Sequence, residues 1–164
     1  MSLRQQLKGA GVALVTPFTK KNTVDYNALG KLIDFIINEG ANYVVALGTT
    51  GETPTLTPQE KIDIIHYTYE KVTNRVPVVI GIGGNNTQAV IKEIENYPLQ
   101  KAVAILSASP YYNKPTQQGI YQHYKLIAEA SPKPVILYNV PARTGSNITA
   151  GTTLRLAKEI KNIA

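Results

Sequence analysis

The sequence predicts an α/β fold built around a parallel β-sheet, and three observations support this prediction. Short apolar segments rich in β-branched residues alternate five times with segments whose apolar residues recur at helical spacing. The repeating unit is roughly 30 residues long, as in a strand–helix–strand motif. The short segments are apolar on both faces, which is typical of strands covered by helices on each side. Both an open, doubly wound sheet and a (β/α)8 barrel satisfy this pattern.

Each expected strand is a short apolar run that is followed by glycine, proline or polar residues. Runs of this kind, about four to eight residues long and bounded by turn-forming residues, are typical of buried strands. The expected strands are residues 11–16, 42–48, 76–83, 102–109 and 134–139.

The first two helices are predicted from apolar periodicity and from their capping residues. The helix expected over 25–39 begins after Asp25, a favourable N-cap residue, and ends before Gly40, which favours termination. Thr57 and Glu60 form a capping box at the start of the second helix. The apolar stripe of the first helix consists of Leu29, Leu32, Ile33, Ile36 and Ile37.

The three later helices are predicted in the same way. The third is expected over 87–97, and Thr116 and Thr149 are the expected N-caps of the fourth and fifth. The expected apolar positions are Val90, Ile91 and Ile94 in the third helix, Ile120, Tyr124 and Ile127 in the fourth, and Leu154, Ala157 and Ile160 in the fifth.

Composition and charge exclude several classes of protein. Hydrophobic residues make up 43% of the chain, and the absence of cysteine excludes disulfide and thiolate chemistry. The 17 basic and 11 acidic residues give a net charge of +6, but the lysines are scattered, so we expect no nucleic-acid partner. No apolar run approaches the ~20 residues of a membrane span. We therefore expect a cytoplasmic protein without a signal peptide or a membrane contact.

The sequence also predicts that the protein uses no metal and no cofactor. His66 and His123 lie on expected helices without metal-ligand spacing, so we assign both to structural roles. The glycine-rich segment 81–87, GIGGNNT, lacks the third glycine of a dinucleotide-binding motif, because Asn86 occupies that position. Neither glycine-rich loop continues into the Lys-Ser/Thr of a phosphate-binding P-loop.

Polar residues gather at the carboxyl ends of the expected strands. They include GTTGET at 48–53, SPYYNKP at 109–115, and YNVPARTG at 138–145. In parallel α/β folds the chemistry takes place at this end of the sheet. The pattern predicts one convergent site, with Arg143 suited to hold a carboxylate through two hydrogen bonds. A lone tyrosine has a pKa near ~10, so Tyr138 needs neighbouring hydroxyls to pass protons at neutral pH.

These three motifs resemble the dihydrodipicolinate synthase/N-acetylneuraminate lyase family of class I aldolases, and the similarity extends from GVALVTPF to the end of the chain. The resemblance implies a (β/α)8 TIM barrel. Residues 1–164 are then the N-terminal portion of one barrel domain, covering about its first five βα units, with no second domain. The arginine of YNVPARTG favours the synthase branch. That branch implies a lyase (hydro-lyase) that joins pyruvate to L-aspartate 4-semialdehyde in diaminopimelate and lysine biosynthesis.

The resemblance also implies a role for each motif residue. Thr50 matches the residue that binds the pyruvate carboxylate, and Arg143 matches the residue that binds aspartate semialdehyde. The catalytic relay of hydroxyls corresponds to Thr49, Tyr112 and Tyr138, in which Tyr138 donates the proton. In the family, Tyr112 reaches into the neighbouring subunit of a tight dimer, and the full-length protein is a homo-oligomer, commonly a homotetramer.

An allosteric lysine pocket is matched only in part. Asn85 and Tyr111 correspond to residues of that pocket. Pro58 and Lys61 stand where lysine-sensitive members often carry histidines, which argues against lysine feedback.

The family also needs a lysine that forms a Schiff base with pyruvate at the end of a sixth strand. Motif spacing puts it about three residues after Ala164, so the 164 residues alone are expected to be inactive. Lys158 and Lys161 follow the fifth helix and do not fit this role. Two alternatives stay open: another pyruvate-dependent aldolase, such as a sugar-acid or N-acetylneuraminate lyase, and a non-catalytic anion-binding fragment.

Overall fold

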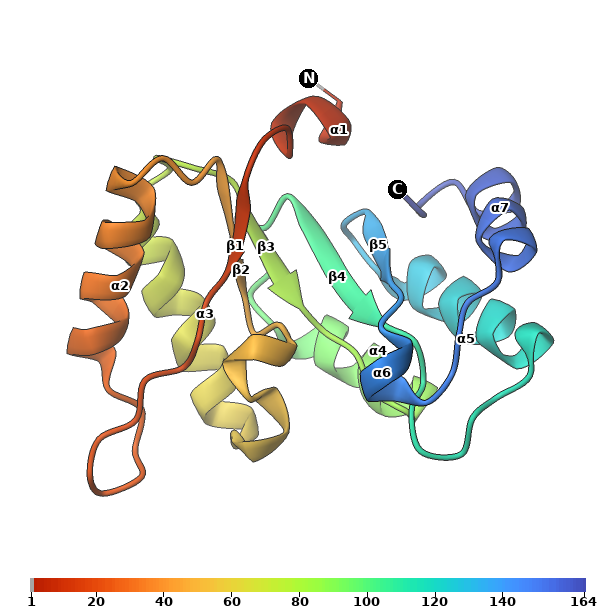
Figure 1. The fold of residues 1–164 in the computed structure, drawn as a ribbon, viewed down its shortest axis with the longest axis horizontal. Coiled ribbons are helices and arrows are strands. Elements are labelled where there is room, and N and C mark those ends of the chain that lie inside the picture. Colours follow the sequence, from red (N-terminus) through yellow and green to blue (C-terminus); the bar gives the residue numbers. More distant parts are fainter. Residues whose placement is uncertain (1) are drawn as a thin grey trace. The chain divides into compact units, whose positions relative to one another are not determined.

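A computed structural model of the chain describes residues 2–164 and contains a five-stranded sheet with strand order β1-β2-β3-β4-β5. The registered pairs β1–β2, β2–β3 and β4–β5 are parallel, which confirms the predicted parallel α/β sheet. The strands are β1 (Gly11–Ala13), β2 (Tyr43–Ala46), β3 (Val78–Gly81), β4 (Ala104–Ala108) and β5 (Val135–Tyr138) (Figure 1).

The helices begin at the predicted capping residues. The side chains of Asp25, Thr57, Thr116 and Thr149 each accept a hydrogen bond from a backbone N–H in the first turn, and the Thr57–Glu60 capping box is complete. The α-helices are α1 (Leu3–Gln6), α2 (Tyr26–Asn38), α3 (Pro58–Val72), α4 (Thr87–Asn96), α5 (Gln117–Ala130), α6 (Pro141–Thr144) and α7 (Ala150–Glu159), and the 3-10 helices are η1 (Thr49–Gly51) and η2 (Thr53–Thr55).

The chain forms two compact units. The first comprises the residues up to Gly81 together with Gln100–Val103, and it contains β1, β2, β3, α2 and α3. Helix α2 packs against α3, and α3 contacts β2 and β3. The fully buried side chains of Ile33 and Ile65 come from the facing helices, and Val44 and Ile80 come from the strands. This packing fixes the ends of β2 and β3, after which the polar loops begin.

The second unit comprises Ile82–Leu99 and the residues from Ala104 onward. Helix α4 packs against α5, and α5 packs against α7. The predicted inward residues of α5 are confirmed, because Ile120, Tyr124 and Ile127 are fully buried. The Tyr124 hydroxyl donates a hydrogen bond to the Ser107 carbonyl at 2.9 Å, which ties α5 to β4.

The last residues of the chain extend the sheet beyond β5. Ile163 forms a parallel bridge with Val135. The Val135 N–H donates to the Asn162 carbonyl at 2.8 Å, and the Ala164 N–H donates to the Val135 carbonyl at 3.0 Å. Residues 162–164 therefore take the position in which a sixth parallel strand begins.

Three expectations about burial and helix content are wrong. Strand β1 is largely exposed, and in β5 only Val135 is fully buried, whereas both were expected to be apolar strands covered on each face. On α7, Leu154 is 55% exposed because the helix packs through Thr152 and Leu156 instead. Helix α6 was not expected, although Pro141 at its first position is a common helix start.

The structural role assigned to His123 is supported by its surroundings. The ring is buried in the second unit, where Nδ1 lies 2.8 Å from the Thr87 hydroxyl and the ring meets Tyr124 edge to face. Its Nε2 has no hydrogen-bond partner among the described residues. Burial lowers the pKa of His123 from 6.5 to about 4. His66, in contrast, is exposed on α3.

We expect the free energy of unfolding to fall as the pH decreases from 6.5 to 4, because the unfolded chain protonates His123 before the folded chain does. The full loss is about 3 kcal/mol, reached near and below pH 4. Urea unfolding between pH 7.5 and 4.5 measures this slope. His123→Phe should flatten the slope, and His66→Gln should leave it unchanged. An equal slope in the wild type and in His123→Phe would refute the assignment.

Candidate active-site loops

The loop after β2 is fixed by hydroxyl-to-carbonyl hydrogen bonds. Leu47 opens it in the left-handed region, with φ 56°. The Thr53 hydroxyl lies 2.9 Å from the Leu47 carbonyl oxygen and 3.0 Å from that of Gly48, so its proton is shared between them. The Thr16 hydroxyl donates to the Gly51 carbonyl at 2.7 Å. These contacts hold the turn that presents the two threonines of GTTGE.

Two glycines allow the backbone to approach closely around this loop. A Cβ atom at Gly81 would collide with the carbonyl group of Leu47 and would lie 2.8 Å from the backbone nitrogen of Gly48. A Cβ atom at Gly51 would lie 3.3 Å from the carbonyl oxygen of Leu14. The position of the loop therefore depends on the absence of side chains on the neighbouring β3 and within the motif itself.

Thr49 and Thr50 expose unpaired polar groups at the start of η1. Both residues are solvent-exposed, and among residues 2–164 neither hydroxyl makes a hydrogen bond. Their backbone N–H groups precede the first hydrogen bond of η1, in which Gly51 donates to Gly48, and no side chain caps them. Hydroxyls and free N–H groups together suit a carboxylate, which is the role that the motif predicts for Thr50.

The second unit carries the predicted residues that follow β4 and β5. Tyr138 is the last residue of β5 and is half-buried. Its carbonyl accepts a hydrogen bond from the Ser109 N–H at 3.3 Å, so the ends of β4 and β5 lie side by side. Within the described part of the chain the Tyr138 hydroxyl has no partner, which leaves it available to a substrate or to other hydroxyls.

The side chain of Asn139 closes the loop that follows β5. Its Nδ2 donates to the Asn147 side-chain oxygen at 2.7 Å, and its Oδ1 accepts from the Ile148 N–H at 3.1 Å. Ile148 is buried. The Asn139 side-chain amide therefore holds the two ends of the loop between residues 139 and 148 together.

Arg143 lies on α6, within the loop of residues 139–148 that the Asn139 side chain holds closed. Pro141 occupies the first position of the helix, and Gly145 ends it with φ 66°. The buried Thr144 hydroxyl anchors the turn through contacts with the carbonyl oxygens of Val140 at 3.2 Å and Ser146 at 2.8 Å. The Arg143 side chain is exposed, and it forms no ion pair or side-chain hydrogen bond within the part of the chain that the structure describes.

The loop after β4 exposes the two tyrosines of SPYYNKP. Tyr112 is 85% exposed with φ 77°, and Lys114 also has a positive φ of 48°. Tyr111 is 38% exposed. The Ser146 hydroxyl donates to the Pro110 carbonyl at 3.1 Å, which joins this loop to the Arg143 loop.

The predicted relay of hydroxyls stays a prediction. Tyr112 lies on the loop after β4 and Tyr138 is the last residue of the neighbouring β5, and no hydrogen bond joins their hydroxyls within the described residues. Thr49 belongs to the first unit, so its approach to the two tyrosines stays a prediction. Asn85 is exposed just before α4, and its pairing with Tyr111 in a pocket also stays a prediction.

Sequence reasoning missed the residues that hold these loops. Thr53, Asn139 and Ser146 make the bonds that set the loop conformations. The hydroxyls of Ser107 and Ser109 are buried at the end of β4 and have no hydrogen-bond partner within residues 2–164. These residues lie in or beside the sequence motifs, but the sequence does not show which groups they bond to. Each hydrogen-bond partner is a residue elsewhere in the sequence or a backbone group.

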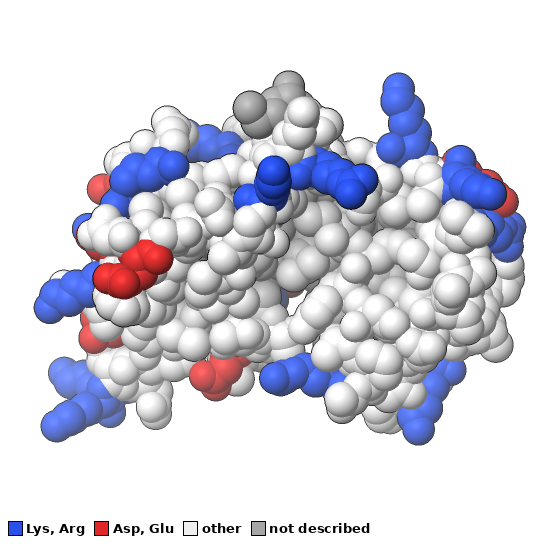
Figure 2. Space-filling view, turned by 45° about the horizontal axis from the view of Figure 1, so that its top comes forward, with Lys and Arg blue, Asp and Glu red and all other residues white. Residues whose placement is uncertain are grey.

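Charge and metal-binding groups add no further site to these loops. On the face drawn in Figure 2, lysine and arginine side chains are spread out and do not form a single patch. Residues 2–164 contain no cluster of three or more histidine, cysteine, aspartate or glutamate side chains suited to a metal ion. None of the described helices is both long enough and apolar enough to cross a membrane.

Comparison with known proteins identifies the family. A sequence model of the dihydrodipicolinate synthetase family matches residues 6–164. The chain is 55% identical over 157 residues to the 4-hydroxy-tetrahydrodipicolinate synthase of Parabacteroides distasonis, and the match covers 96% of this chain and 53% of that protein. The chain thus spans about half the length of the curated relatives it matches.

Solved structures agree with this assignment. The dihydrodipicolinate synthase of Acinetobacter baumannii, solved with pyruvate, is 46% identical with a TM-score of 0.92, covering 96% of this chain and 54% of that one. A synthase variant described as the first monomeric one is 38% identical with a TM-score of 0.92, covering 97% of this chain and 53% of its own. The five parallel strands correspond to the first βα units of these TIM barrels. The chain belongs to the dihydrodipicolinate synthetase family.

Proposed function

We propose that the complete natural chain, meaning the polypeptide that contains residues 1–164, is a 4-hydroxy-tetrahydrodipicolinate synthase. It condenses pyruvate with L-aspartate 4-semialdehyde on the route to diaminopimelate and lysine. The observation that carries the proposal is the exposed Arg143, which has no ion pair among the described residues and lies on the loop after Tyr138 that the Asn139 side chain holds closed. A guanidinium in this state is free to bind the carboxylate of the aldehyde substrate.

In this proposal pyruvate forms an imine with a lysine amine, which releases water and makes the pyruvate methyl carbon nucleophilic as an enamine. The Thr50 hydroxyl and N–H hold the pyruvate carboxylate. The enamine carbon attacks the aldehyde carbon, and Tyr138 donates a proton to the aldehyde oxygen. The amino group of the added aspartate semialdehyde then attacks the imine carbon, which closes the ring and releases the lysine amine. Thr49 and Tyr112 pass a proton back to Tyr138, so that no bare phenolate persists. The mechanism needs no metal and no cofactor.

The imine-forming lysine would follow residue 164. Residues 162–164 pair with β5 in the parallel sense, as the start of a sixth strand would, and the proposal puts the carboxyl end of that strand further along the complete chain. Lys158 and Lys161 lie at and just after the end of α7 and not at a strand end. Residues 1–164 alone should therefore form no imine with pyruvate.

The proposal includes assembly of the complete chain into a tight homodimer and then a homotetramer in the cytoplasm. Tyr112 supports this, because an aromatic side chain that is 85% exposed on a strained loop is suited to enter a neighbouring subunit's site. Asn85 and Tyr111 are the proposed remnant of an allosteric pocket. We expect weak or no inhibition by lysine, because Pro58 and Lys61 replace its usual histidines.

The substrate is tested with Arg143→Ala and Arg143→Lys in the complete chain. The alanine variant should raise the KM for aspartate semialdehyde by about 10- to 100-fold, because it loses a charge-assisted bidentate contact. The lysine variant should recover only part of this loss. Borohydride trapping of the pyruvate imine should be unchanged in both variants.

Two outcomes would contradict the proposed function. Turnover of N-acetylneuraminate in preference to aspartate semialdehyde would identify a different aldolase of the family. Carboxylate binding that survives the combined Tyr138→Phe and Arg143→Ala changes, without any imine in the wild type, would identify a non-catalytic anion-binding protein.

A further inference from the structure

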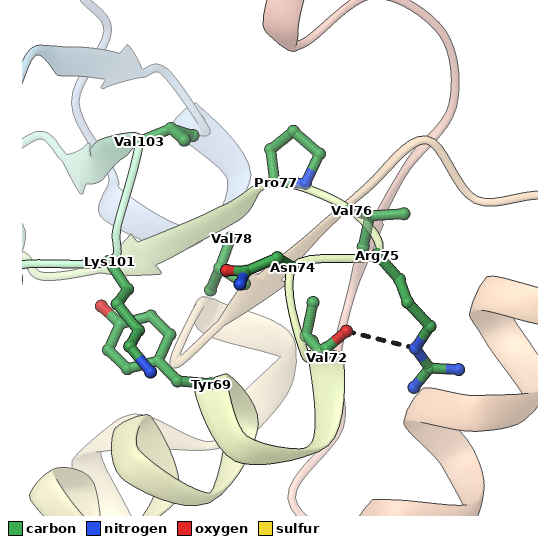
Figure 3. A pocket seen from close by; sticks show the side chains of 9 residues that line it. All are labelled: Tyr69, Val72, Asn74, Arg75, Val76, Pro77, Val78, Lys101 and Val103. Atoms are coloured by element: carbon green, nitrogen blue, oxygen red, sulfur yellow. Dashed lines mark hydrogen bonds between the residues drawn. The ribbon is translucent and has the colours of Figure 1, made fainter.

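The first unit contains a cavity at the amino end of β3, where the loop from α3 enters the strand (Figure 3). Its volume is about 250 Å³, which is slightly below the range typical of sites for drug-sized ligands. It lies at the opposite end of β3 from Gly81 and the GTTGE loop. The lining residues are Tyr69, Val72, Asn74, Arg75, Val76, Pro77, Val78, Lys101 and Val103.

The walls of the cavity are mostly aliphatic. Val72 and Val78 are 2% and 4% exposed and form its buried side. Val76, Pro77 and Val103 are half-buried and form the side nearer the solvent. Such a surface favours the apolar body of a ligand, since burial of methyl and methylene groups away from water is favourable.

One buried hydroxyl on the cavity wall has no partner. Tyr69 is only 8% exposed, and its hydroxyl proton has no acceptor among the described residues. Burial raises the pKa of Tyr69 to about 12, although the nearby Ala102 backbone acts in the opposite direction. The phenol therefore stays protonated and can donate a hydrogen bond to a ligand oxygen. A buried donor without an acceptor is costly, so a ligand that supplies one is favoured.

Of the two cationic side chains among the described residues that line the cavity, Lys101 is available to a ligand and Arg75 is not. Arg75 is not available to a ligand, because its guanidinium donates hydrogen bonds to the Asp34 carboxylate at 2.6 Å and to the carbonyl oxygens of Lys71 and Val72. Figure 3 shows its side chain turned toward Val72 and away from Lys101. Lys101 is exposed and has no ion pair or hydrogen bond within residues 2–164.

A single lysine with one neutral donor matches a monoanion better than a phosphate, whose second charge would need another cation. Asn74, held with φ 61°, presents its amide toward the side of the cavity that Lys101 borders (Figure 3). An amide can supply one more donor to the same anion. The polar groups therefore suit the anionic end of a small ligand, and the aliphatic walls suit its hydrocarbon end.

We propose that this cavity is a binding site for a small aliphatic monocarboxylate. The carboxylate accepts hydrogen bonds from the Lys101 ammonium and the Tyr69 hydroxyl, and the hydrocarbon body packs against the valines. The site is separate from the proposed active-site loops and does not rest on the proposed function.

The test measures the binding of 4-methylpentanoate to the complete chain by isothermal titration calorimetry. An Arg143→Ala background prevents binding at the proposed acceptor site. We expect saturable binding with a Kd below about 10 mM, and none from 4-methylpentan-1-ol, which has the same carbon skeleton without the charge. Lys101→Met should weaken binding about tenfold, whereas Lys92→Met, which removes an exposed lysine of α4 that does not line the cavity, should leave it unchanged.

Two further variants test the geometry. Tyr69→Phe removes only the hydroxyl and should weaken binding about three- to tenfold. Val76→Phe should fill the cavity and abolish binding, and circular dichroism checks that each variant is folded. Equal affinity for the acid and the alcohol, unchanged affinity in Lys101→Met, or no saturable binding would each overturn the proposal. The kinetics of aspartate semialdehyde turnover decide the proposed function separately.

Discussion

Tyr138→Phe in the complete chain should lower kcat by about 10²- to 10⁴-fold, the range typical of general acid–base catalysis. The substitution keeps the ring of a half-buried residue at the end of β5 and removes only a hydroxyl that has no partner among the described residues. The KM values for both substrates should change little, because the phenol acts on the transferred proton and not on either carboxylate. Steady-state kinetics, with pyruvate and aspartate semialdehyde varied in turn, measure the effect.

Tyr121→Phe is the matched control for this change. The Tyr121 hydroxyl donates to Glu159 at 2.7 Å, and the guanidinium carbon of Arg155 lies 3.8 Å from its ring centroid, so the residue links α5 and α7. Its loss should leave kcat unchanged and reduce the free energy of unfolding by about 1 kcal/mol. A kcat for Tyr138→Phe within about threefold of the wild type would remove Tyr138 from the mechanism.

Gly81→Ala should reduce the free energy of unfolding by about 3 kcal/mol, at the upper end of the range for overpacking. The added methyl group would collide with the carbonyl group of Leu47, which is backbone and cannot swing aside. Leu47 is itself buried and already in the left-handed region. Relief of the collision must therefore move the turn that leads into η1, and pyruvate binding should weaken as well.

Gly151→Ala is the corresponding control. A Cβ atom at Gly151, an exposed position near the start of α7, meets no atom within 4 Å. Alanine favours a helix by up to about 1 kcal/mol over glycine, so this variant should be as stable as the wild type or slightly more stable. Urea unfolding compares the two variants. Equal stability of Gly81→Ala and the wild type would show that the loop does not need the glycine.

The sequence predicts local features well where a few neighbouring residues determine them. Thr57 and Glu60 cap α3 as expected, because a capping box involves only residues three positions apart. Tyr138 ends β5 and Arg143 lies on the segment that follows it, as the order of residues in the motif implied. Helix α6 could also have been predicted, because proline is common at the first position of a helix and glycine is common just after the last. Pro141 and Gly145 occupy these two positions.

Burial and the cavity depend on distant segments and were not predictable in this way. Leu154 belongs to an apolar series on α7, but the packing of α7 against α5 buries Leu156 instead. The cavity draws its walls from α3, the entry to β3 and the segment that begins with Lys101. Its valines are unremarkable as sequence, and only the folded chain brings Tyr69 and Lys101 to the same cavity as these valines.

The amide of Asn139 has a thermodynamic consequence for substrate capture. Because it joins Asn147 and Ile148 through hydrogen bonds within the chain itself, the backbone around Arg143 loses its freedom during folding and not during association. If the proposed function holds, the acceptor acid meets a loop backbone that is already ordered around Arg143, and ordering of that backbone does not oppose its binding. Only the Arg143 side chain then has to become ordered when the acid binds.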